Sequence, residues 1–544
     1  MAAPRKWRPL SLSRAMEGHP ISSAASPLFS IPTEILEMIA TYVARDKSHL
    51  ASLALVNSGC RQLARTFQFK TVVLNYDSTA LSILGLLQKE ARHWYLSSNR
   101  ITAPSMGTCI RELCVNTSNY WLYRNGIAPK PLSTTGMTQK QIETERADHL
   151  VTLLVDNIEY LYWPAVYLVI PRLSNLRYLA IEADDVPVAL NDELLDCLVG
   201  LPIEELRLEG KCIHPLTISP VVRDICPRLK VIDVLVWQWV TMEKDPGPFD
   251  SSPFFQALFR SCAATLESVC IGQRVTRKKR YKFEPIHFNS LEFPKLKFLH
   301  ISYPGTILTS SALSSLTPQG LRFLCVRYGE PSLVHFLSER GRINTLETLI
   351  LDADSQPAPE EMASLRFIKS NDQIKTLLMM SPCRDCFIVS ALLSIRHHET
   401  LKKLYVHWFE RSISDDSLNA LSRLCQVEVL CIGAGAFLGH SHDWFVDHKN
   451  IKAHLGHLTT LRRLMFRRDT YQLPPDESEH EARMLEIATE YVKALPNLEF
   501  LVVGKVLFTV YEEQGTRKPV VSGSDWPDDD SVYHKEFGLP GSYY

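Results

Sequence analysis

A short pattern of aliphatic residues recurs along most of the chain. Each copy has an aliphatic residue, two variable positions, a second aliphatic residue, one variable position and a third apolar residue. From Leu176 onward, eight of the eleven intervals between first positions lie between 25 and 30 residues. The regular copies are Leu176-Leu179-Ile181, Ile203-Leu206-Leu208, Leu229-Ile232-Val234, Leu266-Val269-Ile271, Leu296-Leu299-Ile301, Leu321-Leu324-Val326, Leu346-Leu349-Leu351, Ile374-Leu377-Met379, Leu401-Leu404-Val406, Val427-Leu430-Ile432, Leu461-Leu464-Phe466 and Leu498-Leu501-Val503. Two looser copies precede them, namely Ile110-Leu113-Val115 and Ile158-Leu161-Trp163.

Segments with helical spacing separate these strand-like copies. Ser414 and two aspartates precede Leu418 and Leu421, which is an N-cap followed by apolar residues three apart. Leu333 and Leu337 lie in a second such stretch, which Gly341 can terminate. Residues 191–201 and 253–261 have the same character. The pattern therefore predicts a strand of about five residues and a helix in every repeat.

This alternation resembles the leucine-rich repeat, in its cysteine-containing and ribonuclease-inhibitor-like classes, over roughly residues 105–505. The resemblance implies an α/β solenoid with parallel strands on a concave face and helices outside. Those families often carry Asn or Cys three residues after the third apolar position. Here that ladder is absent, so we expect irregular repeats; the alternative is an ordinary α/β domain with parallel strands. The residues at that place include Asp184, Lys211, Pro304, Gly329, Asp354 and Phe409.

Residues 30–66 have a different, purely helical pattern. A helix is expected from Pro32, whose fixed φ suits a first turn, with Ile35, Leu36 and Ile39 on its apolar side. Asp46 can cap a second helix that is apolar nearly all round, and a short third segment follows near residue 61. So few residues cannot bury apolar surface on every side, so we expect a partner to cover part of it.

The same segment resembles an F-box. The resemblance is carried by Ile31-Pro32-Thr33-Glu34-Ile35-Leu36, by Leu50-Ala51-Ser52-Leu53-Ala54-Leu55-Val56 and by Arg61-Gln62-Leu63-Ala64. It implies docking on the small adaptor subunit of a cullin–RING ubiquitin ligase, and an F-box followed by irregular repeats is similar to filamentous fungal members. The implied adaptor contacts are Ile31, Pro32, Ile35, Leu36, Ile39, Leu50, Leu53 and Val56.

Two departures from the family pattern concern Ile31, where leucine is usual, and Cys60, where tryptophan is common. The second removes a large side chain, which would lower affinity for the adaptor. The alternative role for the hairpin is to cap the first repeat, and the two roles are compatible because a solenoid end needs a cap.

These patterns divide the chain into four parts. We expect a disordered tail over 1–28, an F-box-like domain over 29–68, the irregular solenoid over 69–508 and an acidic tail over 509–544. Asp525 and Asp528 to Asp530 give the last part its charge. Residues 116–150 interrupt the repeat, with a helix expected near 141–155.

Composition narrows the classes of function. The 544 residues have a net charge of −1, which gives no general attraction to nucleic acid or anionic membranes. No apolar run is long enough to span a bilayer, and the first thirty residues lack a secretory signal, although a transit peptide stays open beside a simple tail. The 13 cysteines follow no disulfide framework, so reduced thiols and a cytoplasmic or nuclear location are expected.

Candidate chemistry outside the repeat is sparse. Cys383 and Cys386 have metal spacing but lack a second pair, and we favour two loop thiols over zinc. A ragged cluster comprises His440, His442, Asp443, His448, His454 and His457, for which a surface loop is favoured over a metal site. Arg274, Arg277-Lys278-Lys279-Arg280 and Lys282 form a basic run that suits a solvated loop, a nuclear import signal or a phosphate contact. No nucleotide-binding, hydrolase or metalloprotease motif occurs, and no enzyme activity, cofactor or metal is predicted.

The sequence therefore predicts a substrate receptor of a ubiquitin ligase, with an adaptor, a cullin reached through that adaptor and an unknown protein substrate as partners. The alternatives are a repeat scaffold without a ligase and, less favoured, an enzyme or metal protein. Aromatic and charged residues between the aliphatic positions are the candidate substrate contacts. They are Tyr178, Arg207, Asp233, Phe298, His300, Phe323, Arg327, Lys403, Tyr405, His407, Arg463 and Arg467.

Overall fold

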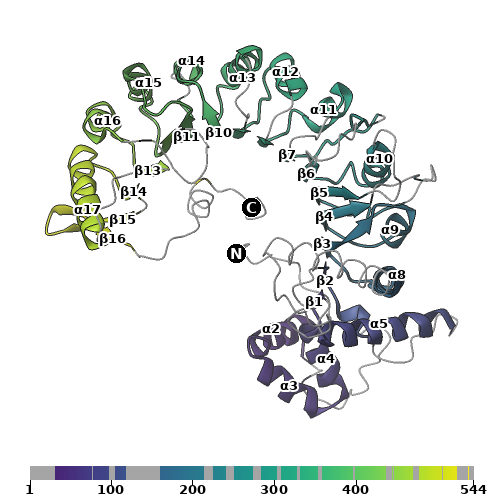
Figure 1. Ribbon diagram of the computed structural model, residues 1–544. Helices are drawn as coiled ribbons and strands as arrows, with labels where there is room; N and C mark the ends of the chain where they lie inside the picture. The colour runs from purple at the N-terminus through teal and green to yellow at the C-terminus, as the bar shows by residue number, and fades with distance from the viewer. Residues whose placement is uncertain are drawn as a thin grey trace, which may run out of the picture. The chain divides into compact units, whose positions relative to one another are not determined.

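The computed structural model describes a large part of the chain, and its elements fall into two compact units (Figure 1). The N-terminal unit holds Lys6–Lys295 and Gly305–Ser315, and the C-terminal unit holds Leu296–Pro304 and Leu316–Tyr544. The described residues are 28, 31–75, 78–96, 105–117, 160–213, 218, 224–240, 250–273, 284–288, 290–302, 308–327, 331–352, 358–395, 399–435, 444, 446–467, 469, 477–504, 506–522 and 537.

Three helices form the hairpin at the start of the N-terminal unit: α2 (Thr33–Val43), α3 (Lys47–Val56) and α4 (Ser58–Gln68). The Asp46 carboxylate accepts a hydrogen bond from the Ser48 backbone N–H, which confirms the predicted cap of the second helix. A small core of Leu36, Ala40 and Leu63 joins α2 to α4. The third segment is a full helix of 11 residues, which is longer than predicted.

Six parallel strands follow in the N-terminal unit, and they lie in sequence order. They are β1 (Thr71–Leu74), β2 (Glu112–Asn116), β3 (Tyr178–Ala189), β4 (Glu205–Ile213), β5 (Val231–Val240) and β6 (Ser268–Gln273). The helical segments around them are α5 (Ser78–Leu96), η2 (Gly107–Cys109), α8 (Tyr160–Val169), η4 (Ile170–Arg172), α9 (Asp192–Cys197), α10 (Ser252–Arg260) and α11 (Ser310–Leu316).

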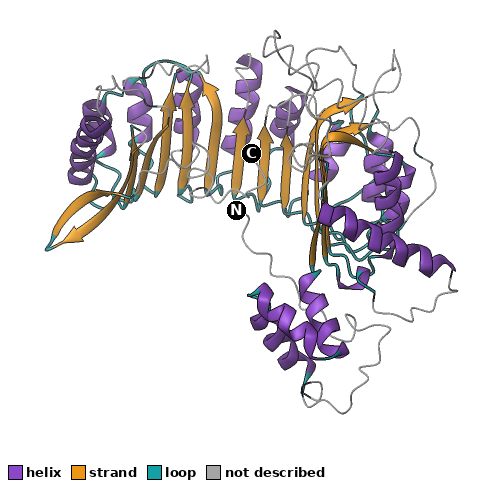
Figure 2. Cartoon of the chain, turned by 60° about the horizontal axis from the view of Figure 1, so that its bottom comes forward, coloured by secondary structure: helices purple, strands orange, loops and turns teal. Residues whose placement is uncertain are grey.

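The C-terminal unit continues the same architecture with a parallel sheet that ends in an antiparallel hairpin (Figure 2). Its strands are β7 (Phe298–Ser302), β8 (Phe323–Arg327), β9 (Thr348–Asp352), β10 (Thr376–Cys383), β11 (Lys403–Trp408), β12 (Val429–Ala434), β13 (Arg463–Arg467), β14 (Phe500–Val503), β15 (Val506–Glu513) and β16 (Thr516–Val521). One face of the sheet is covered by α12 (Pro331–Arg340), α13 (Ala358–Ser370), α14 (Asp385–Ile395), α15 (Asp415–Leu421), α16 (His448–Leu455) and α17 (Glu477–Ala494).

The aliphatic triplets form the core between sheet and helices, as predicted. None of the 36 residues in the twelve regular copies is more than 8% exposed, and the variable position before the third apolar residue faces the other side of the sheet, which we call the open face. The predicted helices near residues 191, 253, 331 and 415 are also present as α9, α10, α12 and α15. The architecture is therefore a mixed α/β repeat with mostly parallel strands, and its helices lie on one face of the sheet.

Four expectations are corrected. The looser copy at Ile158-Leu161-Trp163 is wrong as a strand, because α8 occupies this apolar segment and its Tyr162 hydroxyl donates to the Leu74 carbonyl. β1 pairs with β2 and has the triplet spacing in Phe69-Val72-Leu74, a copy that was missed because its first position is aromatic. β3 to β5 are 12, 9 and 10 residues long, which is about twice the predicted length. The solenoid boundary at 508 falls inside β15, so the sheet extends to Val521. The tail over 1–27, the segment 118–159 and the acidic residues 525–530 lie outside the described residues.

Threonine hydroxyls connect successive repeats in place of the missing asparagine ladder. Thr265, Thr345, Thr400 and Thr460 each directly precede the first aliphatic residue of a copy. Each hydroxyl lies within hydrogen-bonding distance of two backbone carbonyl oxygens of the preceding repeat: Pro227 and Leu229, Gln319 and Leu321, Asp372 and Ile374, and Cys425 and Val427. Each hydroxyl thus offers its one proton to two turn carbonyls of the preceding repeat.

Candidate protein-interaction surfaces

The predicted adaptor contacts are divided between the surface and the interior of the hairpin. Pro32, Ile35, Ile39 and Val56 are exposed, and Ile31 and Leu53 are half-buried. Leu36 and Leu50 are buried inside the hairpin, where Leu36 packs with Ala40 and Leu63. Two of the eight predicted residues therefore stabilise the hairpin and do not present side chains to a partner.

An exposed apolar stripe runs along α2. Ile35, Met38, Ile39 and Tyr42 are 47%, 68%, 43% and 71% exposed, at positions i, i+3, i+4 and i+7 of one helix. We call these four side chains the α2 stripe. Met38 and Tyr42 were not among the predicted contacts, although their helical spacing was a usable signal. α2 thus has two apolar sides, of which Leu36 and Ala40 occupy the inner one.

The end of α3 adds Leu55 and Val56, which are 80% and 67% exposed. Cys60, at the position where an F-box commonly has tryptophan, is instead buried, and its backbone N–H is capped by the Asn57 side chain. Any effect of Cys60 on a partner is therefore indirect, through packing inside the hairpin. On the other side, Gln62 of α4 contacts Cys109 of η2, so the hairpin also covers the start of the repeats.

In the N-terminal unit, the open face carries a charged cluster on β4 and β5. The Arg207 guanidinium pairs with the Glu209 carboxylate and lies 3.8 Å from an Asp233 carboxylate oxygen. Burial raises the pKa of Asp233 to about 6, although Arg207 opposes the shift. Tyr178 lies half-buried on β3, in register with Glu205 of β4. All three predicted contacts of this unit, Tyr178, Arg207 and Asp233, thus lie on the open face, but Arg207 already has carboxylate partners.

In the C-terminal unit, Phe298 and Phe323 stack on neighbouring strands with ring centroids 4.0 Å apart. His300 is only 2% exposed, and His407 is fully buried with its Nε2 2.9 Å from the Gly435 carbonyl oxygen. These two histidines are therefore not available as substrate contacts in the described state, because the neighbouring strands pack around them. Arg327 lies in β8, and its side chain falls outside the described residues.

The remaining predicted contacts gather on β11 and β13. Lys403 and Arg463 are half-buried at the start of their strands. Arg467 is nearly buried, places its guanidinium 5.5 Å from the centroid of the Tyr405 ring and donates a hydrogen bond to the Tyr405 hydroxyl. Burial, followed by repulsion from Arg463, lowers the pKa of Lys403. This part of the open face is therefore electropositive.

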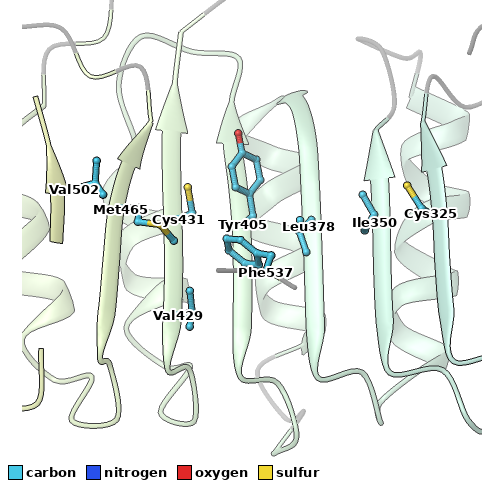
Figure 3. Packing of buried hydrophobic residues seen from close by; sticks show 9 residues of the cluster. All are labelled: Cys325, Ile350, Leu378, Tyr405, Val429, Cys431, Met465, Val502 and Phe537. Carbon is cyan, nitrogen blue, oxygen red and sulfur yellow. The ribbon is translucent and has the colours of Figure 1, made fainter. Parts of the chain in front are cut away.

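An apolar row crosses the open face of the C-terminal unit, and only one of its members, Tyr405, was among the predicted contacts. One residue from each of seven successive strands contributes, and all are at most 8% exposed. The row comprises Cys325, Ile350, Leu378, Tyr405, Cys431, Met465 and Val502, with Phe537 from the end of the chain packed against it (Figure 3). A usable signal existed, because the single variable position between the last two aliphatic positions is apolar in all seven copies.

The candidate metal and basic sites acquire no support. Cys386 is exposed and Cys383 half-buried, and across the described ranges no group of three or more His, Cys, Asp or Glu side chains could hold a metal ion. His448 packs against Phe466 and Tyr491, and burial lowers its pKa to about 4. His440, His442, Asp443 and the basic run at 274–282 lie outside the described residues. Within the described part, no helix is long and apolar enough to cross a membrane.

Comparison with known proteins adds no argument about the fold or the function of the chain. No family model matches the chain, and no curated protein matches it. Among solved structures, the crystal structure of a TLR13–ssRNA13 complex is similar, with 12% sequence identity, a TM-score of 0.24, and coverage of 72% of this chain and 54% of that one. TLR13 is itself a leucine-rich repeat protein. The chain thus spans about half the length of that neighbour, and a likeness this distant supports no conclusion about function.

Proposed function

We propose that this chain is a substrate-receptor subunit of a cullin–RING ubiquitin ligase. In this proposal the helical hairpin docks on the adaptor subunit, and the open face of the sheet binds the protein to be modified. The chain itself supplies no catalytic group. The rate of modification comes from holding the substrate near the ubiquitin-charged partner.

The observation that carries the proposal is the α2 stripe. Burying one large aliphatic side chain is worth about 1.5–3 kcal/mol, so four exposed apolar side chains forgo a substantial stabilisation. Anchors at i, i+3, i+4 and i+7 are the spacing with which an amphipathic helix packs against the helices or groove of another protein. The F-box resemblance of residues 31–64 supports an adaptor subunit as that protein.

The test replaces the exposed side chains without touching the hairpin core. Ile35→Asp combined with Ile39→Asp places two charges in the proposed contact, while Leu36 stays in place because it is buried. We expect the affinity of the full-length chain for a purified ligase adaptor subunit to fall at least 100-fold, since two aliphatic contacts of this size are lost. Isothermal titration calorimetry measures the affinity directly.

The matched control carries the same charge on the same hairpin. Thr41→Asp combined with Ala51→Asp changes exposed positions of α2 and α3 outside the stripe, and we expect it to bind the adaptor like the parent. Circular dichroism should show equal helix content in all three proteins. If the parent does not bind an adaptor, or if the stripe variant binds as tightly as the parent, the ligase function is wrong and a repeat scaffold takes its place.

A further inference from the structure

The apolar row is continuous because each of its residues is the direct partner of the next across the parallel sheet. Cys325 pairs with Ile350, Ile350 with Leu378, and Leu378 with Tyr405. Tyr405 pairs with Cys431, which pairs with Met465, and Met465 in turn pairs with Val502. The face of a repeat sheet that lies opposite its helices is the one left for solvent or for ligands. We therefore expect a chain segment or a ligand to cover this apolar row, which crosses seven strands.

Phe537 supplies part of the cover in the described state. Its side chain is 5% exposed and meets the Tyr405 ring edge-on, with centroids 6.2 Å apart and ring planes at 82° (Figure 3). Phe537 follows the last described strand residue, Val521, by 16 positions. Sixteen residues can span up to roughly 50 Å, whereas five strand spacings from β16 to β11 need only about 24 Å. The contact is therefore within easy reach of the chain.

Charges around the row are complementary to the chain segment that carries Phe537. Lys403, Arg463 and Arg467 lie on the two strands that flank Cys431. The sequence from residue 523 onward contains five acidic residues, Asp525, Asp528, Asp529, Asp530 and Glu536, against the single basic residue Lys535. Phe537, which lies in an acidic stretch of sequence, thus packs against an apolar row that has three basic residues beside it.

We propose that this row is a binding site for an acidic peptide segment carrying one aromatic anchor, and that Phe537 is its built-in ligand. The inference rests on the proposed function, since it names the class of substrate segment that the receptor recognises. A substrate segment of this kind would displace Phe537 and place its own aromatic side chain against Tyr405. The tethered segment acts at an effective concentration in the millimolar range, so only a partner that binds more tightly, or at several points, displaces it.

The test uses the full-length chain and a labelled peptide. The probe is a synthetic peptide with the sequence of residues 525–544 and a fluorescein at its N-terminus, and its binding is followed by fluorescence anisotropy. Phe537→Ala in the protein vacates the row, so we expect this variant to bind the peptide at least tenfold more tightly than the parent does. Tyr511→Ala is the matched control, since it removes an exposed aromatic side chain of β15 away from the row and should bind like the parent.

Peptide variants separate the two parts of the proposed recognition. A peptide with Phe537→Ala should bind the vacated protein at least tenfold more weakly, and one with all five acidic residues changed to Asn or Gln should also bind more weakly, with less dependence on salt. Tyr405→Leu in the vacated protein keeps an apolar side chain but removes the aromatic partner and the acceptor of the Arg467 hydrogen bond. It should lower the affinity for the unchanged peptide but not for the Phe537→Ala peptide. Equal binding by the parent and Phe537→Ala proteins, or of the unchanged and Phe537→Ala peptides, would overturn the proposal.

The outcome is independent of the adaptor test. Peptide binding is measured without an adaptor, and the α2 stripe is intact in every variant used. If the parent chain does not bind an adaptor but the vacated protein binds the peptide, the ligase function alone is refuted. Retained adaptor binding with no peptide binding refutes only the inferred substrate class.

Discussion

Among single residues, Asp233 has the environment from which an effect of pH on stability follows most directly. Its carboxyl group lies on β5 with its side chain 13% exposed, beside an Arg207 that already pairs with Glu209. Burial is the largest influence on its pKa, which rises to about 6 from an ordinary 3.8. The folded protein therefore holds this proton over a pH range in which the unfolded chain has released it.

The sign of the effect on stability follows. Because the folded state binds the proton more tightly, the contribution of Asp233 to stability is fully present below pH 4 and is lost as the pH rises through 6. Raising the pKa of Asp233 from 3.8 to about 6 corresponds to a change of about 3 kcal/mol in the free energy of unfolding. We expect Asp233→Asn to become more stable relative to the parent by up to this amount between pH 4 and pH 7, as measured by urea unfolding at several pH values.

The control variant is Asp416→Asn, which removes an exposed carboxylate. It shows how far the loss of one negative charge alone changes the stability. A stability difference between parent and Asp233→Asn that does not change with pH would show that Asp233 is not held in a protonated state. The pair formed by Arg207 and Glu209 would then be the main charge interaction of this cluster.

At the scale of the repeated elements, four threonine hydroxyls form connections between successive repeats that the sequence pattern did not predict. They belong to Thr265, Thr345, Thr400 and Thr460. Each threonine lies three residues before a strand, and its hydroxyl binds carbonyls of the preceding turn, with oxygen–oxygen distances of 3.1 and 3.1 Å at Thr400 and 2.7 and 3.0 Å at Thr460. Ion pairs also connect successive repeats, such as Lys402–Glu428 and Arg462–Glu499. Those ion pairs are exposed and contribute little to stability, so the threonine hydroxyls are the stronger connection between repeats.

Replacing Thr400 or Thr460 by valine removes the hydroxyl while keeping the shape of the side chain. We expect each substitution to lower the free energy of unfolding by about 1–2 kcal/mol, because the two turn carbonyls lose the one hydroxyl donor that they share. Serine at the same position keeps the donor and should cost less. Thermal unfolding followed by circular dichroism measures both, and a valine variant as stable as the serine variant would contradict the role of the hydroxyl.

The elements also show what the sequence can and cannot predict. The triplet strands were predictable because their inward positions recur with the period of a strand and are all buried. α8 was mistaken for a strand because its segment is apolar on nearly every side, so it has no period that distinguishes helix from strand. β1 was missed because the aromatic Phe69 stands at the first, usually aliphatic, position of its copy.

The candidate surfaces were predictable in part for the same kind of reason. Ile35 and Ile39 followed from helical spacing, whereas the burial of Leu36 depends on how α2 packs against α4. Phe537 could not be located from sequence, because Tyr405, whose ring it meets, lies 132 positions earlier in the chain and its own neighbours have no repeat. Contacts of that range are set by the folded sheet rather than by a local pattern.

At the scale of the whole molecule, the last strands serve to close the sheet. An open edge of a sheet pairs readily with another chain, so repeat proteins need a polar or irregular end. β14 consists of Phe500, Leu501, Val502 and Val503, and β15 and β16 cover it. The outer strand β16 contains Arg517, Lys518 and Pro519, which are residues that discourage further pairing.

Removing this hairpin should therefore turn a monomer into an aggregating protein. We compare a chain that stops at residue 505 with one that stops at residue 522, which lacks Phe537 but keeps β15 and β16. Arg517 also donates hydrogen bonds to the carbonyls of Leu495, Pro496 and Leu498, so the shorter chain loses the donor for the turn that precedes β14 as well as the edge. We expect the longer chain to elute as a monomer in size-exclusion chromatography with light scattering, and the shorter one to form large species at micromolar concentration. If both chains are monomeric, the edge of β14 is protected by its own side chains, and the terminal hairpin has no closing role.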